Sequence, residues 1–172
     1  MRCDKFETLM AGAHHLTIQG TNMAELFAQA DIAAPAARVW DLLADFGNIQ
    51  AWWPRDGALQ VERVVLEGEG IGMLRHIYNR GVPQCASERL DLLDPQTFTL
   101  VLSIVGQRPG GITAYVATSR LVPLDERTCR MEHRALVTTV AGRERAVERF
   151  LQQAYAGMFA GLQAAATGTA TG

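Results

Sequence analysis

The C-terminal part of the chain carries the pattern that most limits what the chain can fold into. Between residues 142 and 166, apolar side chains recur at i, i+3, i+4 and i+7, which is the spacing of one face of an α-helix. The members of this apolar stripe are Val147, Phe150, Leu151, Ala154, Met158, Leu162 and Ala165. A long helix with a continuous apolar stripe is stable only when a broad apolar surface covers it. We therefore expect the rest of the chain to provide that surface.

Most of the preceding chain predicts β-strands. A strand-like run starts at Met23, and from residue 58 onward apolar and polar residues alternate with a period of two. Turns rich in glycine and proline separate the later strands. These strands are expected at residues 58–67, 73–79, 84–93, 98–105, 112–124 and 128–140. Consecutive strands with short turns form an antiparallel sheet, one face of which a helix can cover. The prediction is an α+β fold in which a seven-stranded curved antiparallel sheet wraps around the C-terminal helix.

Two short helices are expected between the first and second strands. Pro35 suits the first turn of a helix, and the residues up to Phe46 supply its apolar side. A second short helix then ends at Pro54. Residues 1–22 show no sustained period, so we expect a mobile leader there, or a chain whose true start is Met23. One domain is predicted at 23–166, followed by a small, polar, disordered tail at 167–172.

Composition limits the functional classes. The net charge is −2, with 48% hydrophobic and 20% charged residues, so no basic excess indicates a nucleic-acid partner. No apolar run approaches the roughly 20 residues that span a bilayer, and the start lacks the apolar segment of a signal peptide. The three cysteines are irregularly spaced, which is typical of reduced thiols in a cytoplasmic protein. Adjacent His14 and His15 cannot share one face of a helix or strand, so no metal site is expected.

Motifs for covalent or nucleotide chemistry were not found. The chain has no nucleophile elbow, no phosphate-binding glycine loop and no zinc-protease helix motif. We therefore expect no cofactor.

Three segments and the closing helix resemble a known superfamily. The segments IAAPAARVWDLLADFGNIQAWWP, GIGMLRHI and SERLDLLD are similar to the START-like (SRPBCC) superfamily and its helix-grip fold, over residues 23–165. The polyketide cyclase/dehydrase-like branch is most similar, and the plant abscisic-acid receptors more distantly. The resemblance implies an apolar cavity between the sheet and the last helix that binds a small hydrophobic molecule.

The receptor comparison argues against hormone binding. Glu88 and Tyr115 fall where the receptors place polar pocket residues. However, the lysine that meets the hormone's carboxylate falls on Trp53, and a pocket serine falls on Ala117. The loop QRPGG also lacks the receptors' His-Arg-Leu latch. A hormone acid would therefore lose its charged partner.

Alternation along the strands predicts which side chains face the helix. In the last strand the more apolar row is Cys129, Met131, His133, Ala135 and Val137. In SERLDLLD the inward row is Ala86, Glu88, Leu90 and Leu92. The superfamily pattern adds the inward residues Arg75, Ile77, Asn79, Tyr115, Ala117, Ser119 and Leu121.

Glu88, Tyr115 and His133 are the candidate catalytic residues. An inward carboxylate at Glu88 needs a partner, which leaves an ion pair with Arg75, a ligand anchor or a general acid or base. His133 is either a hydrogen-bonded core histidine or a proton carrier, and Tyr115 either a core aromatic or a hydroxyl donor. The candidate ligand-binding residues are Trp53, Arg75, Ile77, Asn79, Ala86, Ala117, Phe150, Ala154 and Met158.

Two functions remain open at this point. The first is a non-catalytic carrier or sensor of an apolar or aromatic molecule such as a polyketide or lipid. The second is a cyclase or dehydratase that folds such a chain in its pocket and moves protons with the three candidate catalytic residues. The sequence also leaves open whether the protein forms a homodimer. Gly157 and Gly161 either allow close packing of the last helix or widen the pocket.

Overall fold

The computed structural model describes residues 14–18, 21–55 and 59–168. In chain order its elements are β1 (His14–Ile18), β2 (Thr21–Ile32), α1 (Ala36–Ala44), η1 (Ile49–Ala51), β3 (Val61–Glu67), β4 (Leu74–Asn79), β5 (Ala86–Asp94), β6 (Thr99–Val105), η2 (Pro109–Gly111), β7 (Ile112–Pro123), β8 (Cys129–Thr139) and α2 (Glu144–Thr167). The predicted leader and tail lie mostly outside the described residues.

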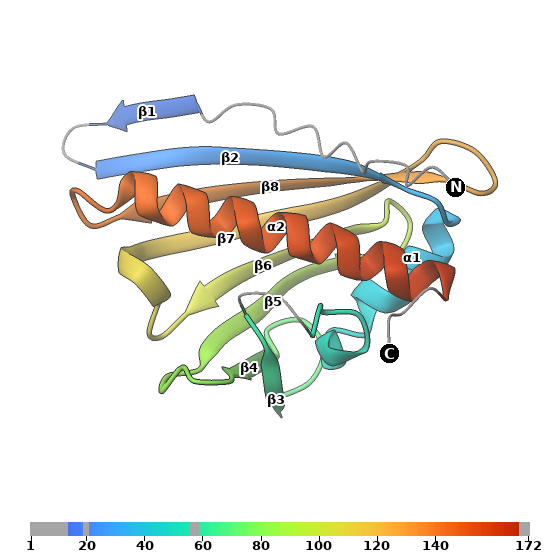
Figure 1. Cartoon of the computed structure of the whole chain (residues 1–172), viewed down its shortest axis with the longest axis horizontal. Coiled ribbons are helices and arrows are strands. Elements are labelled where there is room, and N and C mark those ends of the chain that lie inside the picture. Colours follow the sequence, from blue (N-terminus) through green and yellow to red (C-terminus); the bar gives the residue numbers. More distant parts are fainter. Residues whose placement is uncertain (1–13, 19–20, 56–58, 169–172) are drawn as a thin grey trace.

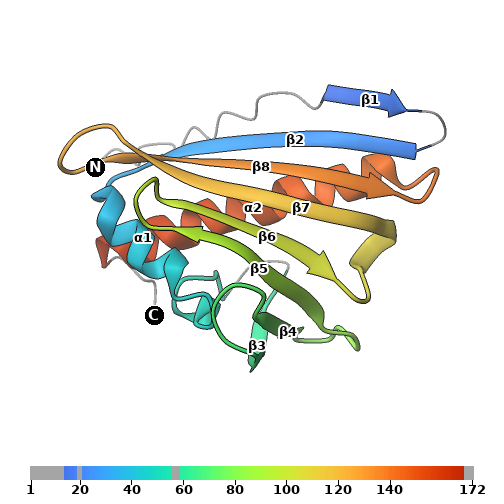
Figure 2. The ribbon, with the colours of Figure 1, turned by 180° about the vertical axis from the view of Figure 1, so that it is seen from behind.

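The strands form one antiparallel sheet in the order β1-β2-β8-β7-β6-β5-β4-β3. Helix α2 lies along one face of this curved sheet, and α1 and η1 lie toward one end of it (Figures 1 and 2). The predicted helix-grip fold is confirmed, with α1 and η1 as the two short helices between the first two predicted strands.

The seven predicted strands are β2 to β8, and β1 is an eighth that the sequence analysis did not predict. Its backbone pairs with β2 in an antiparallel register that runs from His14 opposite Glu25 to Ile18 opposite Thr21. This strand depends on backbone pairing with an existing edge rather than on an apolar period of its own, so residues 14–18 carried no signal in the sequence.

The core lies between the sheet and α2, and the predicted inward rows of β7 and β8 form much of it. In β8 the buried residues are Cys129, Met131, His133, Ala135 and Val137, and in β7 they are Ile112, Tyr115, Ala117, Ser119 and Leu121. From the helix, Leu151, Phe159 and Leu162 pack against this face, each no more than 4% exposed. The apolar stripe of the long helix is thus covered as its length requires.

Strand β5 departs from the predicted alternation. The pairing of β5 with β6 shifts register between Leu90 and Leu92, which marks a β-bulge. Beyond the bulge the two faces exchange, so Leu92 is 43% exposed while Leu93 packs against the core. The prediction that Leu92 faces inward was therefore wrong, whereas Glu88 and Leu90, before the bulge, keep their predicted side.

Gly161 marks a close approach of α2 to another segment. A Cβ at this position would lie 2.0 Å from the carbonyl oxygen of Trp52, whereas one at Gly157 would meet Pro54 at an ordinary 3.8 Å. The close-packing interpretation therefore holds for Gly161. The neighbouring segment is the chain just after η1 rather than the sheet.

Candidate functional site

A cavity of about 130 Å³ lies between the inner face of the sheet and α2. Its wall is mainly apolar and includes Leu100, Leu102 and Ile104 of β6. Of the predicted site residues, those that line it are Trp53, Arg75, Ile77, Asn79, Ala86, Glu88, Tyr115, His133, Phe150, Ala154 and Met158. The cavity therefore collects side chains from six strands, β3 to β8, as well as from α1, η1 with the segment after it, and α2.

Ala117 is the one predicted site residue outside the cavity lining. It is 1% exposed and lies on the inward face of β7 between Tyr115 and Ser119, both of which line the cavity. Its methyl group is too short to reach past these two longer side chains. Ala117 therefore belongs to the core of the sheet.

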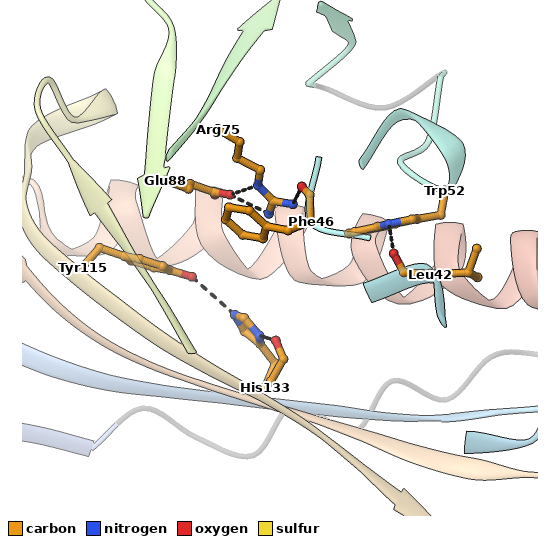
Figure 3. A network of polar contacts seen from close by, with 8 residues as sticks. Leu42, Phe46, Trp52, Arg75, Glu88, Tyr115 and His133 are labelled. Atoms are coloured by element: carbon orange, nitrogen blue, oxygen red, sulfur yellow. Dashed lines mark hydrogen bonds and ion pairs between the residues drawn. The ribbon is translucent and has the colours of Figure 1, made fainter. Parts of the chain in front are cut away.

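Arg75 and Glu88 form an ion pair on the cavity wall (Figure 3). They stand directly opposite each other in the pairing of β4 with β5. Arg75 donates from Nε and Nη2 to the same carboxylate oxygen, Glu88 Oε2, over 2.7 and 2.6 Å. The side chains are 7% and 17% exposed, so the pair is mostly withdrawn from water. Of the three interpretations of Glu88, the ion pair is therefore present.

The two partners of this ion pair differ in the further hydrogen bonds that they make. Arg75 also donates from Nη1 to the carbonyl oxygen of Phe46 over 2.8 Å, and its guanidinium lies 4.0 Å from the centre of the Phe46 ring. This contact ties the loop between α1 and η1 to the sheet (Figure 3). By contrast, no hydrogen bond reaches Glu88 Oε1 from the residues that the structure describes. The pair is nearly neutral overall, and it leaves a carboxylate oxygen able to accept a hydrogen bond.

His133 is held at both ring nitrogens. Ser119 Oγ lies 2.9 Å from Nδ1, and the Tyr115 hydroxyl lies 3.3 Å from Nε2 (Figure 3). The Tyr115 hydroxyl also contacts the Tyr155 hydroxyl of α2 at 3.0 Å. The Tyr155 ring meets the His133 ring edge-on, with centroids 4.4 Å apart. The sheet and the helix thus share one polar network inside an apolar cavity.

Burial sets the protonation of this network. It lowers the pKa of His133 to about 4, so the imidazole is neutral near pH 7. Burial also raises the pKa of Tyr115 well above its usual value, and the charges of Tyr155 and Glu88 act in the same direction. The pKa of Tyr155 is likewise raised by burial. All members are therefore neutral hydrogen-bonding groups at physiological pH.

Tyr155 is a site residue that was not among the predicted ones. It follows Leu151 by four residues and precedes Met158 by three, so it belongs to the same helical face as the apolar stripe. That spacing could have identified it. Ser119 was expected to face inward, but its contact with His133 requires the register of β7 against β8, in which the two residues stand opposite each other.

The cavity continues toward the surface beside Trp53. The Trp53 indole N–H donates to the Leu59 carbonyl over 2.9 Å, which holds the half-buried ring in the wall. An adjoining hollow of about 290 Å³ shares Trp53 and Val61 with the cavity and has a more polar lining that includes Arg55 and Arg80. A ligand longer than the cavity could extend into this hollow.

The described part of the chain was also compared with what a metal site and a membrane-spanning helix require. No group of three or more His, Cys, Asp and Glu side chains in it is arranged to hold a metal ion. Within the same residues, no helix combines the length and apolarity needed to cross a membrane.

The comparisons with known proteins agree with this architecture. A family model described as "Polyketide cyclase / dehydrase and lipid transport" matches residues 23–167. A protein from Thermobifida fusca with a solution NMR structure is 32% identical, at a TM-score of 0.68, and the match covers 83% of this chain and 90% of that one. A comparison with curated protein sequences found no match.

Two more distant structures share the fold. A point mutant of norcoclaurine synthase from Thalictrum flavum, in complex with a transition-state analogue, is 17% identical at a TM-score of 0.72, covering 90% of this chain and 100% of that one. The Zhui aromatase/cyclase from Streptomyces sp. R1128 is 20% identical at a TM-score of 0.70, covering 85% and 94%. At these identities the likeness establishes the fold alone.

Proposed function

Because the chain belongs to the polyketide cyclase / dehydrase and lipid transport family, we propose that it binds an apolar or aromatic small molecule, polyketide-like or lipid-like, between the sheet and α2. The observation that carries this proposal is a mainly apolar cavity into which a few fixed polar groups project. Small-molecule sites have this composition, since apolar walls supply affinity and a few polar groups set orientation.

The cavity volume limits what fits without movement. A cavity of about 150 Å³ is enough for benzene in another protein, so about 130 Å³ suits roughly one aromatic ring here. The remainder of a longer molecule would extend into the hollow beside Trp53. We therefore propose a ligand with one ring or a short apolar segment in the cavity.

A catalytic role would use Glu88 and Tyr115, which line the same cavity. In this proposal Glu88 takes a proton from the carbon between two carbonyl groups, while the Tyr115 hydroxyl stabilises the oxygen on which negative charge develops. The enolate carbon then attacks a third carbonyl carbon further along the chain, which closes the ring, and the oxygen of that carbonyl takes up the proton from Glu88. Loss of the new hydroxyl together with the remaining α-hydrogen, as water, then leaves a carbon–carbon double bond. Such acid–base catalysis typically contributes about 10²–10⁴-fold in rate. His133, neutral and bonded to Tyr115, would position the hydroxyl.

A non-catalytic carrier is the second candidate, and a specific observation favours it. Arg75 and Glu88 already form an ion pair, and both nitrogens of His133 have partners. These polar groups are therefore largely satisfied without a ligand, as in a site that only binds.

Filling the cavity tests ligand binding. Ala154 lines the cavity, whereas Ala160 lies on the exposed side of the same helix. We expect an apolar fluorescent probe to bind the wild-type protein and the Ala160→Trp variant but not the Ala154→Trp variant. Equal probe affinity in all three proteins would refute the proposed cavity.

An assay of substrate turnover distinguishes the catalytic function from the non-catalytic carrier function. On a panel of polyketide-like triketones, cyclase activity should fall about 10²-fold or more in Glu88→Gln if Glu88 is the base, with probe binding retained. Activity that is unchanged in both Glu88→Gln and His133→Ala would remove these residues from the mechanism. Probe binding with no turnover of any triketone would favour the carrier.

A further inference from the structure

The polar network in the cavity is a linear chain of four side chains. Ser119 contacts His133, His133 contacts Tyr115, and Tyr115 contacts Tyr155, over 2.9, 3.3 and 3.0 Å. No member is more than 6% exposed, and all four line the cavity. Among the described residues, these side chains make no other hydrogen bond.

The hydrogens in this chain outnumber its contacts. Each hydroxyl of Ser119, Tyr115 and Tyr155 carries one hydrogen, and the neutral imidazole of His133 carries one N–H. Three contacts consume three of these four hydrogens. One buried donor is therefore left over, and an unused buried donor costs about 1–3 kcal/mol unless a partner satisfies it.

The direction of the hydrogen bonds decides which group holds the spare hydrogen. Neutral His133 donates from one nitrogen and accepts at the other, so the chain can run in either direction. If Ser119 donates to Nδ1, Nε2 donates to Tyr115 and a tyrosine hydroxyl keeps the spare hydrogen. The Ser119 contact is the shorter of the two to the imidazole, at 2.9 against 3.3 Å, which favours this direction.

We propose that the spare hydroxyl hydrogen of Tyr115 or Tyr155 recognises the ligand, and that the site selects a neutral carbonyl compound whose oxygen accepts it. This inference rests on the proposed function, because it needs a ligand in the cavity. It assigns Tyr155 and Ser119 to the site as well. Ser119 acts through His133 and is a positioning residue, whereas a tyrosine hydroxyl touches the ligand.

An acid is disfavoured at the same place. The guanidinium of Arg75 is already engaged by Glu88 and the Phe46 carbonyl. Glu88 presents its second oxygen without a hydrogen-bond partner among the described residues, so it would repel a carboxylate. A buried anion without a cationic partner is costly. Selectivity for a ketone over an acid therefore follows from the charges that line the cavity.

Three probes of nearly the same shape test this inference. Acetophenone carries a carbonyl, α-methylstyrene carries a methylene group in its place, and benzoate carries a carboxylate. Carbonyl-labelled acetophenone bound to the wild-type protein should show a C=O stretch at lower wavenumber than in hexane. Benzoate should bind at least about tenfold more weakly than acetophenone, because leaving a buried charge unpaired costs more than one neutral hydrogen bond.

A double variant identifies the donor. Both tyrosines are replaced, because removing only one leaves the other hydroxyl at the end of the chain. In Tyr115→Phe/Tyr155→Phe, the imidazole N–H that donated to Tyr115 is the donor that remains, at a different place in the cavity. The C=O stretch should therefore move away from its wild-type position, and acetophenone affinity should fall about tenfold. α-Methylstyrene affinity should stay within about twofold, which also shows that the variant is folded. Tyr78→Phe is the matched control, since Tyr78 lies over Arg63 and does not line the cavity.

The outcomes separate the two proposals. If acetophenone binds with the same C=O frequency in the wild-type protein and the double variant, or if benzoate binds more tightly than acetophenone, this inference is overturned while the cavity stands. If none of the three probes binds the wild-type protein, the proposed function itself fails.

Discussion

Acidification from pH 7 to pH 4 should destabilise this protein through one residue, His133. Burial lowers the pKa of His133 from its ordinary 6.5 to about 4 in the folded state. In the unfolded chain the imidazole is in water and takes up a proton below about pH 6.5. Between these two values the unfolded state binds more protons than the folded state, so the free energy of unfolding falls as the pH falls. Above pH 6.5 and below pH 4, His133 does not make the free energy of unfolding depend on pH.

The size of the effect follows from the same two pKa values. At about 1.4 kcal/mol per pKa unit, a decrease from 6.5 to about 4 amounts to about 3 kcal/mol. This is a large share of the roughly 5–15 kcal/mol by which most domains are stable. His133 is 4% exposed, so solvent does little to screen the penalty of charging it.

Urea unfolding followed by tryptophan fluorescence at pH 4, 5, 6 and 7 measures this loss. The control is His133→Gln, which keeps a hydrogen-bonding side chain at the position but cannot take up a proton in this range. Asp31, Asp94 and Asp125 also have lowered pKa values, because hydrogen bonds stabilise their charged forms, and they are common to both proteins. The wild-type protein should lose about 3 kcal/mol more than the variant between pH 7 and pH 4. Parallel pH profiles would refute a buried neutral imidazole.

Four further substitutions test the packing and the ion pair. Gly161→Ala should destabilise the protein by about 1–3 kcal/mol in urea unfolding, because its Cβ would meet the backbone oxygen of Trp52 at 2.0 Å; a neutral result would contradict the close approach. Gly157→Ala should instead stabilise it by up to about 1 kcal/mol, since its nearest neighbour is at 3.8 Å, and a loss of stability there would show that the helix is closer than described. Glu88→Leu should cost about 3–5 kcal/mol because it leaves Arg75 buried and unpaired, and Arg75→Met in the same chain should recover most of that loss; a double variant as unstable as the single one would mean that the pair is not the cause.

Alternation and helical spacing carried most of the fold prediction. The inward row of β8 was predicted residue by residue from alternation, because a buried strand face repeats every second position, whereas the inward row of β7 came from the resemblance to the superfamily. The same logic failed at Leu92, where a bulge inserts one residue and exchanges the faces. A bulge has no local signature in this segment and becomes visible only in the pairing of β5 with β6. Strand β1 was missed for a similar reason, since only β2 makes it a strand.

The sequence could predict the candidate site where it was enough to know which face of the sheet a side chain points to. It could not predict the contacts that depend on the distance between two residues. Arg75 and Glu88 were placed on one side of the sheet from the sequence, but three interpretations of Glu88 remained until their cross-strand pairing was known. The contact between Tyr115 and Tyr155 joins residues 40 positions apart, on a strand and a helix. The spacing of apolar residues along the sequence does not predict such a contact.

The amino-acid sequence alone determined that a long amphipathic helix must lie on a curved antiparallel sheet, because apolar periods of 3.6 and 2 residues require complementary surfaces to bury them. It also determined which strand faces carry the carboxylate of Glu88 and the imidazole of His133, whereas the face of the Tyr115 phenol came from the resemblance to the superfamily. Only the tertiary structure decided that α2 leaves a cavity over β6, that Ala117 stays outside it, and that Tyr155 completes the network around His133. The physical reason is that periodicity specifies the direction of a side chain, whereas volume and hydrogen bonding depend on how closely two separately formed elements pack.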